Sequence, residues 1–200
     1  MKLFRNWVLA VVVVSSLALA ADASTIKVTG WKPVFIGIEQ ASGTIDGVDA
    51  SMAYALRVDL RAPGIRFYTA PRQGSLNTIS STTSDFLLKY GLQVAINANF
   101  FAPCCHAFTE DKSVLGLAVS DGNVVSPAVS TAGENAALLI SRKNKASIAT
   151  TTETTDLSDI FNAVTGSGII VQNGVNVGDQ TPYGDGADPN SRTVVGLSKD

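Results

Sequence analysis

The chain is poor in the residues from which metal and redox centres are built. Its 200 residues include one histidine, His106, and two cysteines, the neighbours Cys104 and Cys105. Zinc sites usually draw their ligands from two separated groups, so a single cluster does not predict one. In an oxidising compartment the two thiols form a vicinal disulfide, bridge to another chain or stay free. We expect a redox or structural loop here and assign no catalysis to His106 alone.

Charge is scarce and nearly balanced. Only 16% of the residues are charged and the formal net charge is -2, so the chain has no basic footprint for nucleic acid or for anionic lipid. Hydrophobic residues make up 46% of the sequence, which argues against disorder. The length after residue 23 suits one domain with a real core.

Long apolar runs are absent except at the N-terminus. Lys2 and Arg5 precede an apolar run over residues 7–14, and small-residue cleavage patterns follow at residues 18–20 and 21–23. This order is typical of a secretory signal peptide; an uncleaved membrane anchor, which needs about 20 apolar residues, is the alternative. We expect residues 1–23 to be removed, leaving an exported protein without membrane contact that is periplasmic, on the cell surface or extracellular.

Alternation with a period of two dominates the rest of the chain, residues 24–200, and predicts strands joined by hairpins. Asp121-Gly122 and Asn173-Gly174 are hairpin turns that the sequence predicts. Capping residues predict two short helices, over residues 83–90 and 157–163. The expected fold class is therefore α+β, a single domain of mainly antiparallel sheet with two short helices. The predicted strands are residues 34–39, 54–60, 65–69, 92–97, 115–120, 123–126, 137–141, 146–150, 169–172 and 192–198.

Two asparagines stand in an apolar context at residues 95–101, which read Ala-Ile-Asn-Ala-Asn-Phe-Phe. In a strand Asn97, Asn99 and Phe101 would share one face. Burying an amide without partners costs about 1–3 kcal/mol, so a chain that places two of them at alternate positions usually uses them. They form the floor of a site for a polar ligand, or they cap a turn after a core strand.

Four segments in order resemble the phosphodiester glycosidase domain family, which occurs in the mammalian lysosomal uncovering enzyme and in many exported bacterial proteins. The chain departs from the family pattern at Ala98 and Asn99, where glycines are usual, and at the inserted Asn190-Ser191. The family's later Asp-Gly-Gly-Gly-Ser stretch does not appear, so we expect the C-terminal part of the domain to be missing. The matching segments are residues 95–101, 116–122, 165–174 and 188–197.

The resemblance implies hydrolysis of a sugar-1-phosphodiester at the anomeric carbon, which releases the sugar and a phosphomonoester. Arg192 offers a guanidinium fork suited to phosphate oxygens. A carboxylate is needed to stabilise the oxocarbenium-like transition state or to activate water, and Asp188 is ranked before Asp185 and Asp179. The predicted catalytic residues are Asp188 and Arg192, and the predicted substrate-binding residues are Asn97, Asn99, Phe101, Gly168 and Asn173.

No cofactor and no metal ligand is assigned, although the oxygen-rich loop at residues 178–190 leaves a loose calcium site open. The expected partner is a carbohydrate or glycopolymer phosphodiester. The alternative function is a non-catalytic carbohydrate-binding or envelope-assembly module on the same fold.

Overall fold

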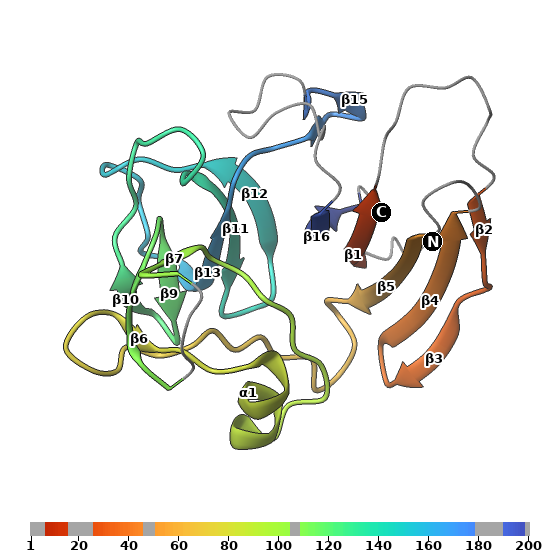
Figure 1. Ribbon diagram of the computed structural model, residues 1–200, viewed down its shortest axis with the longest axis horizontal. Coiled ribbons are helices and arrows are strands. Elements are labelled where there is room, and N and C mark those ends of the chain that lie inside the picture. The colour runs from red at the N-terminus through yellow and green to blue at the C-terminus, as the bar shows by residue number, and fades with distance from the viewer. Residues whose placement is uncertain (1–6, 16–25, 46–50, 105–108, 179–189, 199–200) are drawn as a thin grey trace. The chain divides into compact units, whose positions relative to one another are not determined.

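A computed structural model describes residues 7–15, 26–45, 51–104, 109–178 and 190–198 (Figure 1). The chain divides into two compact units. One comprises Met1–Ile65 with Gly184–Asp200, and the other comprises Arg66–Tyr183. Each unit is described by itself.

The described residues form sixteen strands and one helix. The elements are β1 (Trp7–Ser15), β2 (Ile26–Val28), β3 (Lys32–Phe35), β4 (Ile38–Ile45), β5 (Ser51–Asp59), β6 (Thr78–Ile79), α1 (Thr83–Tyr90), β7 (Phe101–Ala102), β8 (Asp111–Val114), β9 (Ala118–Ser120), β10 (Asn123–Ser126), β11 (Ala136–Ser141), β12 (Ala146–Thr150), β13 (Ile160–Gly166), β14 (Val171–Gln172), β15 (Val175–Asn176) and β16 (Asn190–Leu197).

The fold is mainly β, and the predicted α+β class with two helices is wrong. The first predicted helix is α1. It begins where the Thr82 hydroxyl accepts a hydrogen bond from the backbone N–H of Asp85 at 3.0 Å, and it ends at Gly91 in the left-handed region at φ 61°. In the described part of the chain, no helix is long and apolar enough to cross a membrane.

The second predicted helix, over residues 157–163, is replaced by β13. The capping residues before it close turns instead: Asp156 Oδ1 accepts from the Ser158 N–H at 2.9 Å, and Thr155 Oγ1 accepts from the Thr152 N–H at 2.8 Å. Polar side chains of this kind serve turns as readily as helix starts. The residues that follow are rich in β-branched and aromatic types, which fit a half-buried strand better.

The first unit is a six-stranded sheet in the order β16-β1-β5-β4-β2, with β3 also paired to β4. Its second strand, β1, consists of the apolar part of the predicted signal peptide. It pairs antiparallel with β16 over eight residue pairs and with β5 over six. Both neighbours therefore depend on β1 to satisfy one edge of their backbone.

The second unit contains a five-stranded antiparallel sheet in the order β10-β9-β13-β11-β12, drawn in green to blue in Figure 1. Its core is built from small and medium side chains that meet across the strands. Leu139 is paired with Ala163, which is paired in turn with Val119. Alternate residues of each strand point to this layer, and the buried cluster is Leu117, Val119, Ala128, Ala137, Leu139 and Ala163.

Two hairpin turns of this unit follow the sequence closely. Asp121 and Gly122 join β9 to β10 with φ angles of 50° and 81°, and Asn173 and Gly174 join β14 to β15 with 53° and 79°. Both central residues are left-handed, as the two-residue hairpin turn requires.

Two predicted strands, residues 65–69 and 92–97, are not strands. The backbone of the first segment accepts hydrogen bonds from side chains of the sheet, where pairing with a neighbouring strand was expected. Asn162 Nδ2 donates to the Phe67 carbonyl at 3.1 Å, and Ser120 Oγ donates to the Thr69 carbonyl at 2.7 Å. Alternation in the sequence indicates which side chains are buried. It does not show whether the backbone of the segment pairs with a neighbouring strand.

Candidate functional site

Asn99 is the anchor of the asparagine segment. Its Nδ2 donates to the carbonyls of Leu115 and Leu117, each at 3.0 Å, and its Oδ1 accepts from the backbone N–H of Thr165 at 3.2 Å. Three of the four hydrogen bonds that an amide side chain can make are thus used inside the protein. The amide holds residues 95–101 against the chain before β9 and the end of β13.

The other two residues predicted on the same face have different surroundings. Asn97 is exposed, and Phe101 is half-buried in β7, where it pairs with Val114 of β8. Since residues 92–97 form no strand, the period of two that would align Asn97, Asn99 and Phe101 does not apply along this segment. The segment presents Asn97 outward while Asn99 fixes its backbone.

Asn99 also connects this segment to the glycine-rich stretch after β13. Thr165, its hydrogen-bond donor, is three residues before Gly168, which is half-buried. Asn173 lies further on, exposed in the β14–β15 turn. The structure therefore places all five predicted substrate-binding residues in one unit, and through Asn99 it joins the start of the glycine stretch directly to the asparagine segment.

Of the two predicted catalytic residues, Asp188 and Arg192, only Arg192 lies among the described residues. Arg192 is in β16 of the other compact unit, with an exposed side chain. Within the described residues its guanidinium makes no ion pair and one long hydrogen bond, from Nη1 to the Ser191 carbonyl at 3.4 Å. Asp188, Asp185 and Asp179 fall outside the described residues, as does most of the predicted calcium loop.

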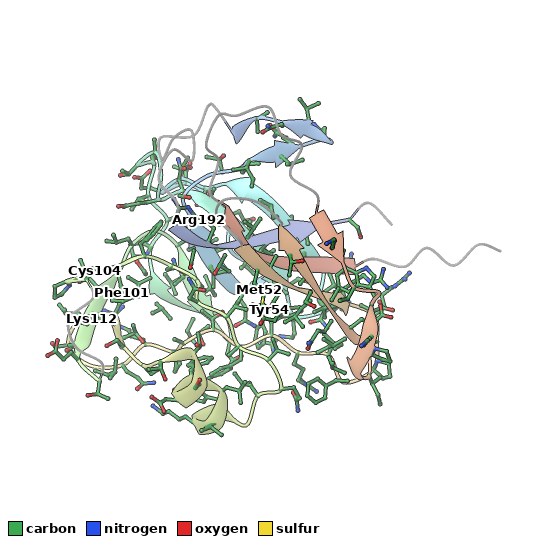
Figure 2. All side chains as sticks on the ribbon, turned by 45° about the vertical axis from the view of Figure 1, so that its right-hand side comes forward. Met52, Tyr54, Phe101, Cys104, Lys112 and Arg192 are labelled. Carbon is green, nitrogen blue, oxygen red and sulfur yellow. The ribbon has the colours of Figure 1, made fainter. Side chains whose placement is uncertain are left out.

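A buried cation near the asparagine segment was missed by the sequence reasoning. Lys112 of β8 is 2% exposed, and its Nζ lies 3.1 Å from Glu110 Oε2. Because Ala102 pairs with Ser113, β7 brings the end of the asparagine segment beside this lysine, and Figure 2 shows Phe101 and Lys112 at the same edge of the unit. An isolated lysine in a polar strand carries no sequence signal for burial, so only the fold reveals it.

Next to Lys112, Asp111 organises a neighbouring loop. Its carboxylate accepts hydrogen bonds from the Ser75 hydroxyl at 2.5 Å, the Ser75 N–H at 2.6 Å and the Leu76 N–H at 3.1 Å. These donors, the Ser75 hydroxyl above all, hold the pKa of Asp111 below its ordinary value of 3.8. The loop is fixed by an ionised carboxylate at neutral pH.

The cysteine segment follows β7 directly. Cys104 is disulfide-bonded, and the chain's other cysteine is its neighbour Cys105, which with His106 falls outside the described residues. Among the residues that the structure describes, no group of three or more His, Cys, Asp or Glu side chains is placed to hold a metal ion. The prediction of a structural or redox loop beside the asparagines stays a prediction.

Comparison with known families identifies the class of protein. The profile of the phosphodiester glycosidase family matches residues 90–200, more than half of the chain. No curated protein and no solved structure matches the sequence. The match spans the asparagine segment, Lys112, the glycine stretch and Arg192.

The chain belongs to the phosphodiester glycosidase family. The name of the family indicates glycosidase-type enzymes, and at the level of the family it suggests phosphodiester glycosidase activity.

Proposed function

We propose that this protein is an exported hydrolase that cleaves the glycosidic bond of sugar-1-phosphodiesters. The observation that carries the proposal is the family match over residues 90–200, which contains Asn97, Asn99 and Arg192. In the reaction the bond between the anomeric carbon and the phosphate oxygen breaks, and water supplies the new hydroxyl at that carbon. The aglycone keeps the phosphate as a monoester.

The chemistry asks for donors that face the departing phosphate. A phosphate group leaves as a stable anion and needs little protonation. The main task of the enzyme is therefore to stabilise the negative charge of the departing phosphate. Arg192 suits this task because its guanidinium is exposed and, among the described residues, is not committed to a carboxylate. A guanidinium binds two phosphate oxygens through parallel N–H donors, which an ammonium cannot do.

The asparagine segment serves the sugar side in this proposal. The three hydrogen bonds of Asn99 fix the backbone of residues 95–101, and Asn97 is then presented to solvent from a positioned loop. Positioning of this kind lowers the entropy that is lost on binding. Asp188 supplies the carboxylate that such a reaction needs.

The test is release of free sugar and of phosphomonoester from a synthetic sugar-1-phosphodiester. Arg192→Ala should lower kcat/KM by about 100-fold or more without changing the melting temperature, and Arg192→Lys should recover only part of the loss. Arg66→Ala, at another exposed arginine, is the matched control. Equal activity of Arg192→Ala and the wild type would contradict the role of Arg192, and binding of the substrate without turnover by the wild type would favour the carbohydrate-binding module.

A further inference from the structure

The unit of residues 66–183 has a pocket lined by α1, β6 and neighbouring residues, and none of residues 95–101 lines it. Its volume is about 220 Å³. Pockets for drug-sized ligands measure about 300–1,000 Å³, so this one is suited to a single ring rather than to a larger ligand. It lies wholly within one unit.

Aromatic rings form one wall. Phe86 and Tyr90 of α1 line the pocket, and their ring centroids are 4.9 Å apart. Tyr68 stands behind them, 4.7 Å from Tyr90 and 5.9 Å from Phe86, and burial followed by the proximity of Tyr90 raises the pKa of Tyr68. Gln73 Nε2 donates to the Tyr90 hydroxyl at 2.9 Å, which fixes the ring. The wall is amphipathic, as aromatic binding surfaces usually are.

The rest of the lining is mixed: Ala70 and Ile79 are apolar, and polar side chains stand among them. Asp85 and Lys89, one turn apart on α1, contribute a carboxylate and an ammonium. The Asp85 Oδ2 accepts from the Thr82 hydroxyl at 2.7 Å, and within the described residues Oδ1 accepts no hydrogen bond. Hydroxyls and an amide also line the pocket, from Gln73, Thr78, Ser80, Ser81 and Thr109.

We propose that this pocket binds one pyranose ring of a glycan, as a sugar-binding subsite separate from the asparagine segment. A sugar ring has an apolar C–H face, which packs on Phe86 or Tyr90, and an edge of hydroxyls, which donate to the Asp85 carboxylate and exchange hydrogen bonds with the polar lining. Asp85 offsets the charge of Lys89, so an anion such as phosphate gains little here. The Asp85 carboxylate and the Lys89 ammonium at the pocket disfavour a lipid chain.

The inference extends the proposed function, because a second sugar position indicates a substrate with more than one sugar ring. In this account β6, which carries Thr78 in the pocket, pairs with β8, and β8 pairs with β7 at the end of the asparagine segment. A three-stranded sheet therefore connects the pocket to the predicted binding segment.

Saturation-transfer NMR with methyl α-D-glucopyranoside tests the proposal on the purified protein, with acyclic glycerol as the control ligand. Irradiation of the aromatic protons should transfer magnetisation to the sugar ring and not to glycerol. Asp85→Asn should weaken binding by at least about five-fold, the effect of one hydrogen bond. Lys143→Ala, an exposed change in the β11–β12 turn, should leave the affinity unchanged.

Absence of transfer to the sugar, equal transfer to glycerol, equal affinity of Asp85→Asn and the wild type, or displacement of the sugar by inorganic phosphate would each overturn the subsite. A melting curve for Asp85→Asn shows that the variant is folded. Because binding is read without turnover, loss of binding with hydrolysis intact refutes only the subsite, and binding without hydrolysis refutes only the proposed enzyme activity.

Discussion

Asn99 and Thr165, which are 66 residues apart, are joined by a hydrogen bond of 3.2 Å from the Thr165 N–H to the Asn99 side-chain oxygen. The same side chain donates to two carbonyls of the chain that leads into β9. One amide thus fastens the segment before β7 both to the chain that leads into β9 and to the end of β13. The position of Asn97 at the surface therefore depends on the hydrogen bonds of Asn99.

Replacing Asn99 by alanine should therefore act on stability first. The change leaves two carbonyls and one N–H without their partner in a half-buried place, so we expect a loss of about 2–4 kcal/mol in the free energy of unfolding. Urea denaturation measures it. Asn123→Ala, at an exposed residue with one long hydrogen bond, should cost less than about 0.5 kcal/mol. Similar values for the two variants would refute the anchoring role.

Gly116 should not tolerate a side chain. Its φ is +71°, and a Cβ there would overlap the Glu134 carbonyl oxygen and the Thr165 side chain. Gly174 has a similar φ of +79° with open space around it. We expect Gly174→Ala to cost about 1 kcal/mol, the price of the backbone conformation alone.

Gly116→Ala adds steric overlap with backbone inside a packed region to the same backbone strain, and should cost about 2 kcal/mol more than Gly174→Ala. Thermal melting of both variants gives the comparison. Equal melting temperatures would show that the backbone near Gly116 yields easily.

Removal of residues 1–23, as signal-peptide cleavage would achieve, should open the sheet of the first unit. Without β1, β16 loses the eight residue pairs that satisfy its backbone, and β5 loses six. We expect amide hydrogens of Asn190–Leu197 to exchange much faster in the shortened chain, while those of Ala136–Ser141 keep their protection.

Hydrogen exchange with mass spectrometry compares the two chains segment by segment. Unchanged protection of β16 in the shortened chain would mean that β1 is not its partner, or that another strand takes the vacant position. Protection lost in both segments would show that the two units do not open separately.

Asp111 should make the stability of its loop depend on acid. Its pKa is below the ordinary 3.8 in the folded state, so the carboxylate stabilises the fold above that pH, and the contribution disappears as the pH falls through the lowered pKa. The difference in unfolding free energy between the wild type and Asp111→Asn should be present at neutral pH and vanish well below pH 3.8. Urea denaturation of the wild type and of Asp111→Asn, at neutral pH and well below pH 3.8, measures this difference in unfolding free energy. A difference that is independent of pH would assign the effect to packing.

Local signals in the sequence predicted much of this fold. Asp121-Gly122 and Asn173-Gly174 fix their turns because both positions need a left-handed backbone, and Thr82 with Gly91 fixes the ends of α1. Each of these outcomes depends on a few adjacent residues.

The failures depend on distant partners. Asp156 caps a turn rather than a helix because the residues that follow pair as β13 between β9 and β11. Residues 92–97 form no strand because the side chain of Asn99, rather than backbone pairing, holds the segment in place. The burial of Lys112 beside β7 has the same origin. For the candidate site, the sequence indicated the asparagine segment. Only the structure shows that Asn99 anchors this segment while Asn97 is exposed.

Hydrolysis of a sugar-1-phosphodiester in water enriched in ¹⁸O tests the central claim most directly, because it shows which bond breaks. The proposed glycosidase puts the label on the anomeric hydroxyl of the released sugar and leaves the phosphomonoester unlabelled. Label in the phosphomonoester would mean cleavage at phosphorus and would contradict the account, as would the absence of any product.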